Sequence, residues 1–304
     1  MCCLFGIIDY GHNFTGRQKA RILSILSAEC EARGTDATGI AYNSGGRLHI
    51  YKRPLPAHRL RFALPNDTPA IMGHTRMTTQ GSEKRNGNNH PFQGAVQGRP
   101  FALAHNGVLY NDLVLRDTLH LPSTSIQTDS YVAVQLLEQQ NALGFDSLKY
   151  MAEAVEGSFT FTVLDGQENL YIVKGDNPMC LCHFPRTGLY LYASTDVILG
   201  RALKRLHIPL EKPMRVETDC GDILKISWAG AITRGHFHND KLRQPWYSPI
   251  YCPGRKLAWE QEDYIDELKS VAASFGYTPE MIDRLIDQGF STDELEEMLY
   301  CGEL

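Results

Sequence analysis

The fold is indicated first by an apolar run that ends at an acidic residue, Met1-Cys2-Cys3-Leu4-Phe5-Gly6-Ile7-Ile8-Asp9. A short uninterrupted run of this kind is typical of a buried strand. Cys2 directly precedes that strand, and a small second residue permits removal of the initiator methionine. A mature chain starting at Cys2 would carry a thiol and an α-amine on one residue. Such an amine titrates at about 7.7 to 8.0, so it could accept the thiol proton without a histidine.

The composition is that of a folded globular protein. The chain has 304 residues, 43% of them hydrophobic and 21% charged. Its formal net charge of -5, with scattered Lys and Arg residues, indicates no nucleic-acid binding. Because no apolar run reaches about 18 residues and no basic segment precedes the first strand, we expect a cytoplasmic protein without a membrane segment.

The eight cysteines are dispersed along the chain, which favours reduced thiols over a disulfide scaffold. Cys180 and Cys182 are separated by one residue, whereas zinc and redox motifs have two residues between their cysteines. The sequence therefore predicts no metal site.

Residues 2–235 alternate between strand and helix patterns, which is typical of a layered α+β domain. Helices are expected at Arg17–Arg33 and at Asp129–Gln139, the second capped by Asp129. Strands are expected at Cys3–Ile8, Gly39–Tyr42, Leu48–Arg53, Ala70–His74, Phe101–His105, Phe159–Leu164, Leu170–Lys174, Leu189–Ala193, Asp222–Ser227 and Ala231–Arg234.

The pattern changes after the first domain. Residues 236–255 are rich in proline and aromatic residues, so they predict a linker, and residues 256–304 predict a small helical C-terminal extension of three helices. Thr278-Pro279 begins the second of these helices with a cap and a proline at the first position. The stretch 281–290 resembles three-helix modules of the ubiquitin-associated type, which would dock a partner. The alternative is a helical cap on the main domain.

Six motifs occur in one order along the first domain: Cys2-Cys3-Leu4-Phe5-Gly6, Arg33-Gly34-Thr35-Asp36-Ala37-Thr38-Gly39, Gly73-His74-Thr75-Arg76, Asn89-His90-Pro91-Phe92, Ala104-His105-Asn106-Gly107 and Thr128-Asp129-Ser130. Together they resemble the glutaminase domain of the class II glutamine amidotransferases, which include glucosamine-6-phosphate synthase and amidophosphoribosyltransferase. The resemblance covers residues 2–235. It implies a four-layer αββα sandwich of the N-terminal-nucleophile hydrolase type, and hydrolysis of L-glutamine to glutamate and ammonia without a cofactor or metal.

The resemblance also implies a role for each site residue. Cys2 is the nucleophile that forms a γ-glutamyl thioester, with its own amine as the base. Arg76 grips the α-carboxylate of glutamine, because a guanidinium matches a carboxylate with two parallel hydrogen bonds. Asp129 pairs with the α-ammonium group, and Thr79 contacts the substrate from the loop after Arg76. These groups would select an amino acid by its charged end.

Asn106 and Gly107 should form the oxyanion hole, through the asparagine amide and the glycine backbone N–H. Asn-Gly after a strand also reads as a tight turn, and both interpretations can hold. Arg33 and Asp36 are expected to support the site as an internal ion pair and turn that hold the Cys2 strand.

Three histidines invite a triad interpretation, but their spacing gives it little support, and the resembling family uses the equivalent residues structurally: His74, His90 and His105. The sequence departs from the family pattern at three positions. Cys3 replaces a common glycine, Met77 stands where some members carry a tryptophan lid, and Gln80 replaces a common histidine.

The sequence does not identify the group that receives the ammonia. Only about 70 residues follow Gly235, too few for a synthase domain, so we expect a free-standing glutaminase whose ammonia goes to a separate synthase subunit. A homo-oligomer is also possible. Two other classes stay open: an amidohydrolase of another γ-glutamyl or small amide substrate, and a non-catalytic glutamine-binding module.

Overall fold

The computed structural model describes residues 2–243, 265, 268–269, 272, 277–288, 290, 295 and 298. The chain divides into two compact units, Met1–Arg243 and Gln244–Leu304. Much of the expected linker at 236–255, and most of the first and third expected C-terminal helices, lie outside the described residues.

Two antiparallel sheets form the centre of the first unit. Within the described residues the first sheet has seven strands, ordered β11 (Met214–Val216), β9 (Cys180–Phe184), β10 (Leu189–Ala193), β1 (Cys3–Asp9), β4 (Ala70–Arg76), β2 (Ala37–Ser44) and β3 (Arg47–Arg53). The second has six, ordered β13 (Ile232–His236), β12 (Asp222–Ile226), β8 (Leu170–Lys174), β7 (Gly157–Asp165), β6 (Arg99–Leu109) and β5 (Phe92–Val96). The strand at Cys2 is thus central in its sheet.

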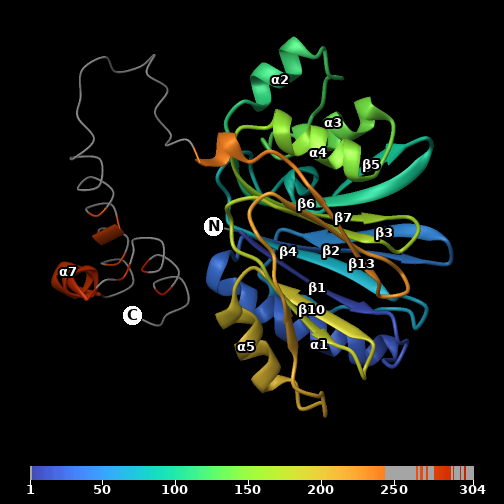
Figure 1. Cartoon of the computed structure of the whole chain (residues 1–304), viewed down its shortest axis with the longest axis vertical. Helices are drawn as coiled ribbons and strands as arrows, with labels where there is room; N and C mark the ends of the chain where they lie inside the picture. Colours follow the sequence, from blue (N-terminus) through green and yellow to red (C-terminus); the bar gives the residue numbers. More distant parts are fainter. Residues whose placement is uncertain are drawn as a thin grey trace. The chain divides into compact units, whose positions relative to one another are not determined.

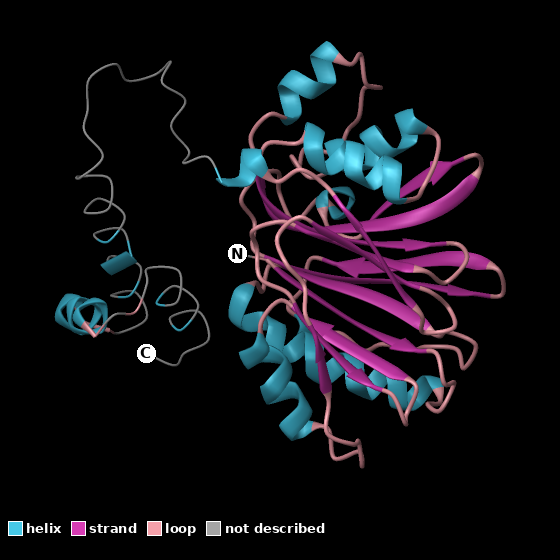
Figure 2. Cartoon of the chain, viewed as in Figure 1, coloured by secondary structure: helices cyan, strands magenta, loops and turns pink. Residues whose placement is uncertain are grey.

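Helices cover both outer faces of the paired sheets (Figure 1). The first sheet carries α1 (Gly16–Glu29) and α5 (Asp196–Arg205), and the second carries α2 (Asp112–Thr118), α3 (Tyr131–Gln140) and α4 (Phe145–Ala154). Figure 2 shows the resulting order of helix, strand, strand and helix layers. The expected α+β sandwich with four αββα layers is therefore confirmed. Short 3₁₀ turns lie at η1 (Cys30–Arg33), η2 (Ala57–Arg59), η3 (Asn86–Asn88) and η4 (Asp240–Arg243).

The two sheets bury their facing sides against each other. Leu4, Ile8 and Met72 of the first sheet pack with Ala104 and Leu164 of the second. Because side chains alternate along a strand, the other side of the second sheet forms a separate core with α3 and α4. This double burial explains why the strands read as continuous apolar runs rather than alternating ones.

The helix that follows β1 begins and ends for local reasons. Thr15 Oγ1 accepts from Gln18 N, and the Gln18 side chain accepts from Thr15 N at 2.9 Å, which is a capping box. The helix was expected at Arg17–Arg33, whereas the observed α-helix ends at Glu29. Its last turn, Cys30–Arg33, is a 3₁₀ turn that leads to Gly34.

Two local expectations around the site are wrong. Asn106-Gly107 is not a turn, because β6 continues to Leu109 and stays paired with β7 throughout. Asp129 does not cap α3. Its carboxylate accepts from Leu109 N instead, and the helix begins at Tyr131 without a side-chain cap.

The second unit contains α7 (Pro279–Asp287), preceded by Thr278 as its N-cap residue and with proline in its first turn. Leu268, Ala272, Ile282 and Leu295 form a small buried cluster of their own. None of the described helices, in either unit, is long and apolar enough to cross a membrane.

Candidate active site

Cys2 lies at the start of β1, in the middle of the first sheet. Cys3 pairs with Thr75 across the β1–β4 ladder, so Cys2 stands opposite Arg76, the last residue of β4. Arg33 Nε donates to Cys2 O at 3.1 Å, and the Arg33 side chain is almost completely buried. The backbone of Cys2 is therefore anchored from the 3₁₀ turn after α1.

The surroundings of Cys2 disfavour the thiolate. Burial raises the pKa of the Cys2 thiol above its ordinary value, and the hydrogen bond to the Met77 carbonyl and the nearby Arg76 charge offset this only partly. The hydrogen bond of Cys2 Sγ is to Met77 O, at 3.5 Å. No histidine within residues 2–243 hydrogen-bonds the sulfur, so the thiol needs another proton acceptor before it can attack a carbonyl.

The guanidinium of Arg76 is buried and held by the loop that follows it. Nη1 donates to Asn89 Oδ1 at 2.8 Å, and Nη2 donates to the carbonyl oxygens of Gln80 at 2.5 Å and Gly81 at 3.0 Å. Backbone carbonyls thus occupy the donors that a substrate carboxylate would need. Asn89 belongs to a motif quoted above, but the sequence alone indicated no role for it.

Asp129 lies across the same cavity. Its Oδ2 accepts from Leu109 N at 2.6 Å and its Oδ1 from Ser130 Oγ at 3.3 Å, which fixes the carboxylate at the end of β6. Asp129 N donates to Gln80 Oε1 at 2.9 Å. Gln80 therefore bridges both groups that the sequence predicts to bind the charged end of glutamine.

Asn106 and Gly107 lie on β6, in the sheet that faces β1. Alternation puts Asn106 on the same side as Ala104, which packs against Leu4. Asn106 is fully buried, and neither Nδ2 nor Oδ1 has a hydrogen-bond partner within the described part of the chain. Gly107 has φ 141°, and an added Cβ would lie 1.9 Å from Ser158 O, so this position requires glycine.

A small cavity lies between Cys2, Arg76 and Asp129, with room for about one water, and Asn106 is not among the residues that line it. Five of the residues predicted from the sequence contribute to its wall: Cys2, Arg76, Thr79, Gly107 and Asp129. A cavity of this size is far smaller than an amino acid such as glutamine.

The two expected supporting residues flank the cavity. Arg33 anchors Cys2 as described above. Asp36 Oδ2 accepts from Thr78 N at 2.7 Å, and Asp36 N donates to Arg76 O at 2.9 Å. Asp36 thus ties the start of the loop to the strand that carries Arg76.

Three buried histidines lie at the cavity, two of which, His90 and His105, line it, and burial lowers the pKa of each. For His74 the pKa falls to about 3. His74 Nε2 donates to His105 O at 2.9 Å, and His105 Nδ1 is hydrogen-bonded to Ser130 Oγ at 2.8 Å. Uncharged rings that join β4, β6 and α3 favour a structural role.

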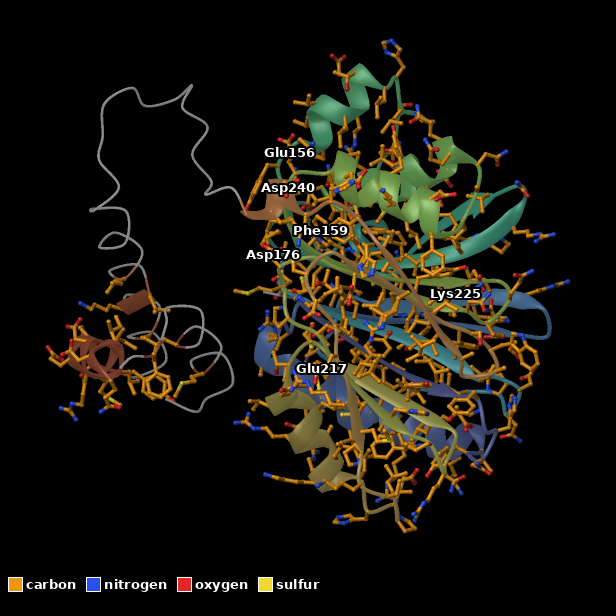
Figure 3. The ribbon with its side chains drawn as sticks, in the orientation of Figure 1. Glu156, Phe159, Asp176, Glu217, Lys225 and Asp240 are labelled. Carbon is orange, nitrogen blue, oxygen red and sulfur yellow. The ribbon has the colours of Figure 1, made fainter. Side chains whose placement is uncertain are left out.

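The turn after β8 is hydrogen-bonded to β7, the strand beside Asn106 and Gly107, a feature that the sequence did not indicate. Asp176 Oδ1 accepts from Phe159 N at 2.8 Å, and Figure 3 shows these two residues at the same end of the sandwich. Thr160 Oγ1 donates to Asn177 O at 2.7 Å. Phe159 and Thr160 pair directly with Gly107 and Asn106.

The described residues contain no group of three His, Cys, Asp or Glu side chains arranged to hold a metal ion. Cysteines 2, 3, 30, 180, 182 and 220 are free thiols.

Comparison with solved structures defines the class of fold. The chain superimposes on the glutamine phosphoribosylpyrophosphate amidotransferase of B. subtilis, complexed with ADP and GMP, with a TM-score of 0.62, over 78% of this chain and 49% of that one, at 19% sequence identity. A structure described as the allosteric regulatory enzyme of purine biosynthesis gives 0.61 at 20% identity, with the same coverage. The fold is that of the N-terminal-nucleophile hydrolases.

Sequence comparison then gives the family of the domain. Residues 74–200 match the model of the glutamine amidotransferase domain. The glutamine–fructose-6-phosphate aminotransferase (isomerizing) of Bacillus licheniformis is 33% identical over 183 residues, which is 57% of this chain and 29% of that protein. Its counterpart from Streptococcus agalactiae is 28% identical over 191 residues, covering 60% of this chain and 30% of that protein. Residues 74–200 are therefore similar to a glutamine amidotransferase domain, and the chain spans less than a third of these relatives' length.

Proposed function

We propose that this domain hydrolyses L-glutamine to glutamate and ammonia through a thioester on Cys2. Removal of Met1 frees the α-amine, which accepts the thiol proton. The sulfur then attacks the δ-carbonyl carbon, and the amine returns the proton to the departing nitrogen, which leaves as ammonia. Water next attacks the γ-glutamyl thioester and releases glutamate and the thiol. All atoms of this cycle come from the chain, glutamine and water.

The amide of Asn106 carries the proposal. A buried polar group without a partner costs about 1–3 kcal/mol, so most proteins avoid one. Asn106 presents both of its polar atoms in this state at the end of β6, next to Gly107 and on the side that faces β1. A donor that stays unpaired in the resting protein is available to the oxygen that becomes negative in the tetrahedral intermediate.

The charged end of the substrate explains the remaining contacts. When glutamine enters, its α-carboxylate replaces the Gln80 and Gly81 carbonyls on Arg76, and its α-ammonium approaches Asp129. Thr79 moves with the loop and contacts the amino acid. The loop carbonyls accept hydrogen bonds from the same guanidinium that would bind the substrate carboxylate. Opening of the loop and binding of glutamine are therefore coupled.

A glutamine-mimicking electrophile tests the nucleophile directly. We expect 6-diazo-5-oxo-norleucine to add once to Cys2, as located by mass spectrometry, and intact mass to show a chain without Met1. The Cys2→Ala variant should take up no label and release no ammonia. If Met1 is retained and Cys2 stays unlabelled, the chain is a glutamine-binding module. If the label is accepted but another γ-glutamyl amide is cleaved faster than glutamine, it is a different amidohydrolase.

The ammonia is further proposed to serve a separate synthase subunit. The relatives are named glutamine–fructose-6-phosphate aminotransferases, and this chain matches less than a third of their length. We propose that residues 256–304 dock such a partner. The test compares how much of a synthase subunit co-purifies with the full chain and with a chain that ends at residue 254. Equal recovery of the partner by both chains would contradict it.

A further inference from the structure

A basic groove lies on the outer face of the first sheet. It runs between α1 and the segment around η2 and encloses about 710 Å³. Five of its lining residues carry basic side chains: Arg17, Arg21, His58, Arg59 and Arg61. None of its lining residues belongs to the Cys2 cavity, and α1 covers the other side of the sheet from β6. We call this feature the α1 groove.

The arginines of the α1 groove have no acidic partner within the part of the chain that the structure describes. All four are exposed, and the described residues offer none of them an ion pair. Two acidic residues that follow α1 or end it have other partners, since Glu31 binds His58 at 3.0 Å and Glu29 pairs with Arg205. The sequence contains no Asp or Glu at positions 10–28 or 37–66. The positive field is therefore local, in a chain whose net charge is -5.

The placement of the positive charges on α1 is unfavourable for the helix itself. Arg17 lies in the first turn, which contains no acidic residue, and the N-terminal end of a helix dipole disfavours cations. Arg21 is one turn further on the same face, so the two like charges repel. An anion bound between α1 and η2 would relieve both effects, which is a physical reason to expect a ligand here.

We infer that the α1 groove binds a phosphorylated small molecule with at least two negative charges. Guanidinium groups bind phosphate oxygens through paired, charge-assisted hydrogen bonds, and arginines converge on the groove from both of its walls. Phe62 adds an apolar surface beside them for the carbon part of the ligand. A nucleic acid is disfavoured, because a long polyanion would extend beyond the groove over a protein of net negative charge.

Calorimetric titration of the full chain tests this inference, with inorganic pyrophosphate, glucose 6-phosphate and glucose as probes. We expect saturable binding of both phosphates at one site, weakened by salt, and no binding of glucose. Thermal unfolding should occur at a higher temperature when pyrophosphate is present.

The Arg59→Ala/Arg61→Ala double variant should weaken pyrophosphate binding at least about tenfold, since it removes two charge-assisted contacts. The matched control is Arg47→Ala/Arg99→Ala, two exposed arginines elsewhere on the domain, which should bind as the wild type does. The Cys2→Ala variant should also bind pyrophosphate normally, so the result does not depend on glutamine hydrolysis.

Three outcomes overturn the inference: no saturable binding of either phosphate up to about 10 mM, equal weakening by the control pair, or tighter binding of DNA than of both phosphates. Circular dichroism checks that each variant is folded, and the Arg17→Ala/Arg21→Ala pair gives a second variant on the opposite wall. That pair should also weaken binding while leaving α1 at least as stable.

Discussion

Replacing Asn106 by leucine should stabilise the protein and inactivate it at the same time. Asn106 has no solvent exposure, and both polar atoms of its amide lack partners within the described residues. Leucine is close in shape to asparagine but needs no hydrogen bonds. The opposite signs follow from the proposed mechanism, in which the amide is reserved for an oxygen that becomes negative only during the reaction.

The two magnitudes come from separate principles. Removing an unpartnered buried amide recovers about 1–3 kcal/mol, of which crowding by the larger leucine takes back a part. A net gain of about 1 kcal/mol raises the midpoint of thermal unfolding by about 2–4 °C in a domain of this size. Loss of one oxyanion donor lowers kcat by about 10² to 10³, or about 2.7–4 kcal/mol of transition-state stabilisation.

Urea unfolding and ammonia release measure these two effects on the same preparation. The matched control is Asn43→Leu. Asn43 is also buried, but its Nδ2 donates to Asp165 O at 2.8 Å, so its replacement removes a buried hydrogen bond and should cost about 1–3 kcal/mol without changing kcat. An Asn106→Leu variant that is less stable than the wild type, or that keeps kcat within about threefold, would refute the reasoning.

Three further predictions concern the residues around the cavity. Arg76→Lys should raise KM for glutamine at least about tenfold, because an ammonium cannot form the paired contact of a guanidinium, and an unchanged KM in steady-state kinetics would contradict this. Gly107→Ala should destabilise the β6–β7 pairing by several kcal/mol in urea unfolding, since the new Cβ would meet Ser158 O at 1.9 Å with φ at 141°. His74→Gln should flatten the loss of stability at acid pH. The pKa of His74 is about 3 in the folded protein and about 6.5 in the unfolded chain. Between these two values the unfolded chain binds a proton at His74 and the folded protein does not. The free energy of unfolding therefore falls by up to about 1.36 kcal/mol for each pH unit as the pH is lowered from about 6.5 towards 3. Stability curves of the two proteins that stay parallel over that range would show that His74 is not the titrating group.

The strands at the centre of the fold were predicted more completely than the elements around them. β1, β4, β8 and β10 are apolar runs bounded by turn residues, and both of their faces are buried, so the pattern is strong. β5 was missed because alternate residues of Phe92–Val96 are exposed and two of its five positions are glycine or alanine. α5 was missed although Thr195 accepts from Ile198 N as a helix cap, a signal that its sequence contains.

The bounds of β6 could not be predicted from local chemistry. Asn-Gly is a strong turn signal, yet here glycine allows the close approach of Ser158 O on the neighbouring strand, 51 residues later in the chain. The sequence likewise predicts that the carboxylate of Asp129 caps the helix that follows it, because a local pattern shows only neighbours along the chain. Its partner, Leu109 N, lies at the end of β6, and no local pattern indicates that contact.

By itself, the sequence determined the fold class, the family of the domain and the residues that gather around Cys2, because these depend on residue types in a fixed order along buried strands. Only the tertiary structure decided what each side chain contacts. It showed Gln80 bridging Arg76 and Asp129, Asn106 without a hydrogen-bond partner among the described residues, and arginines from α1 and the segment around η2 in one groove. Hydrogen bonds and fields of charge act over a few ångströms between residues far apart in the chain, and their partners are set by packing.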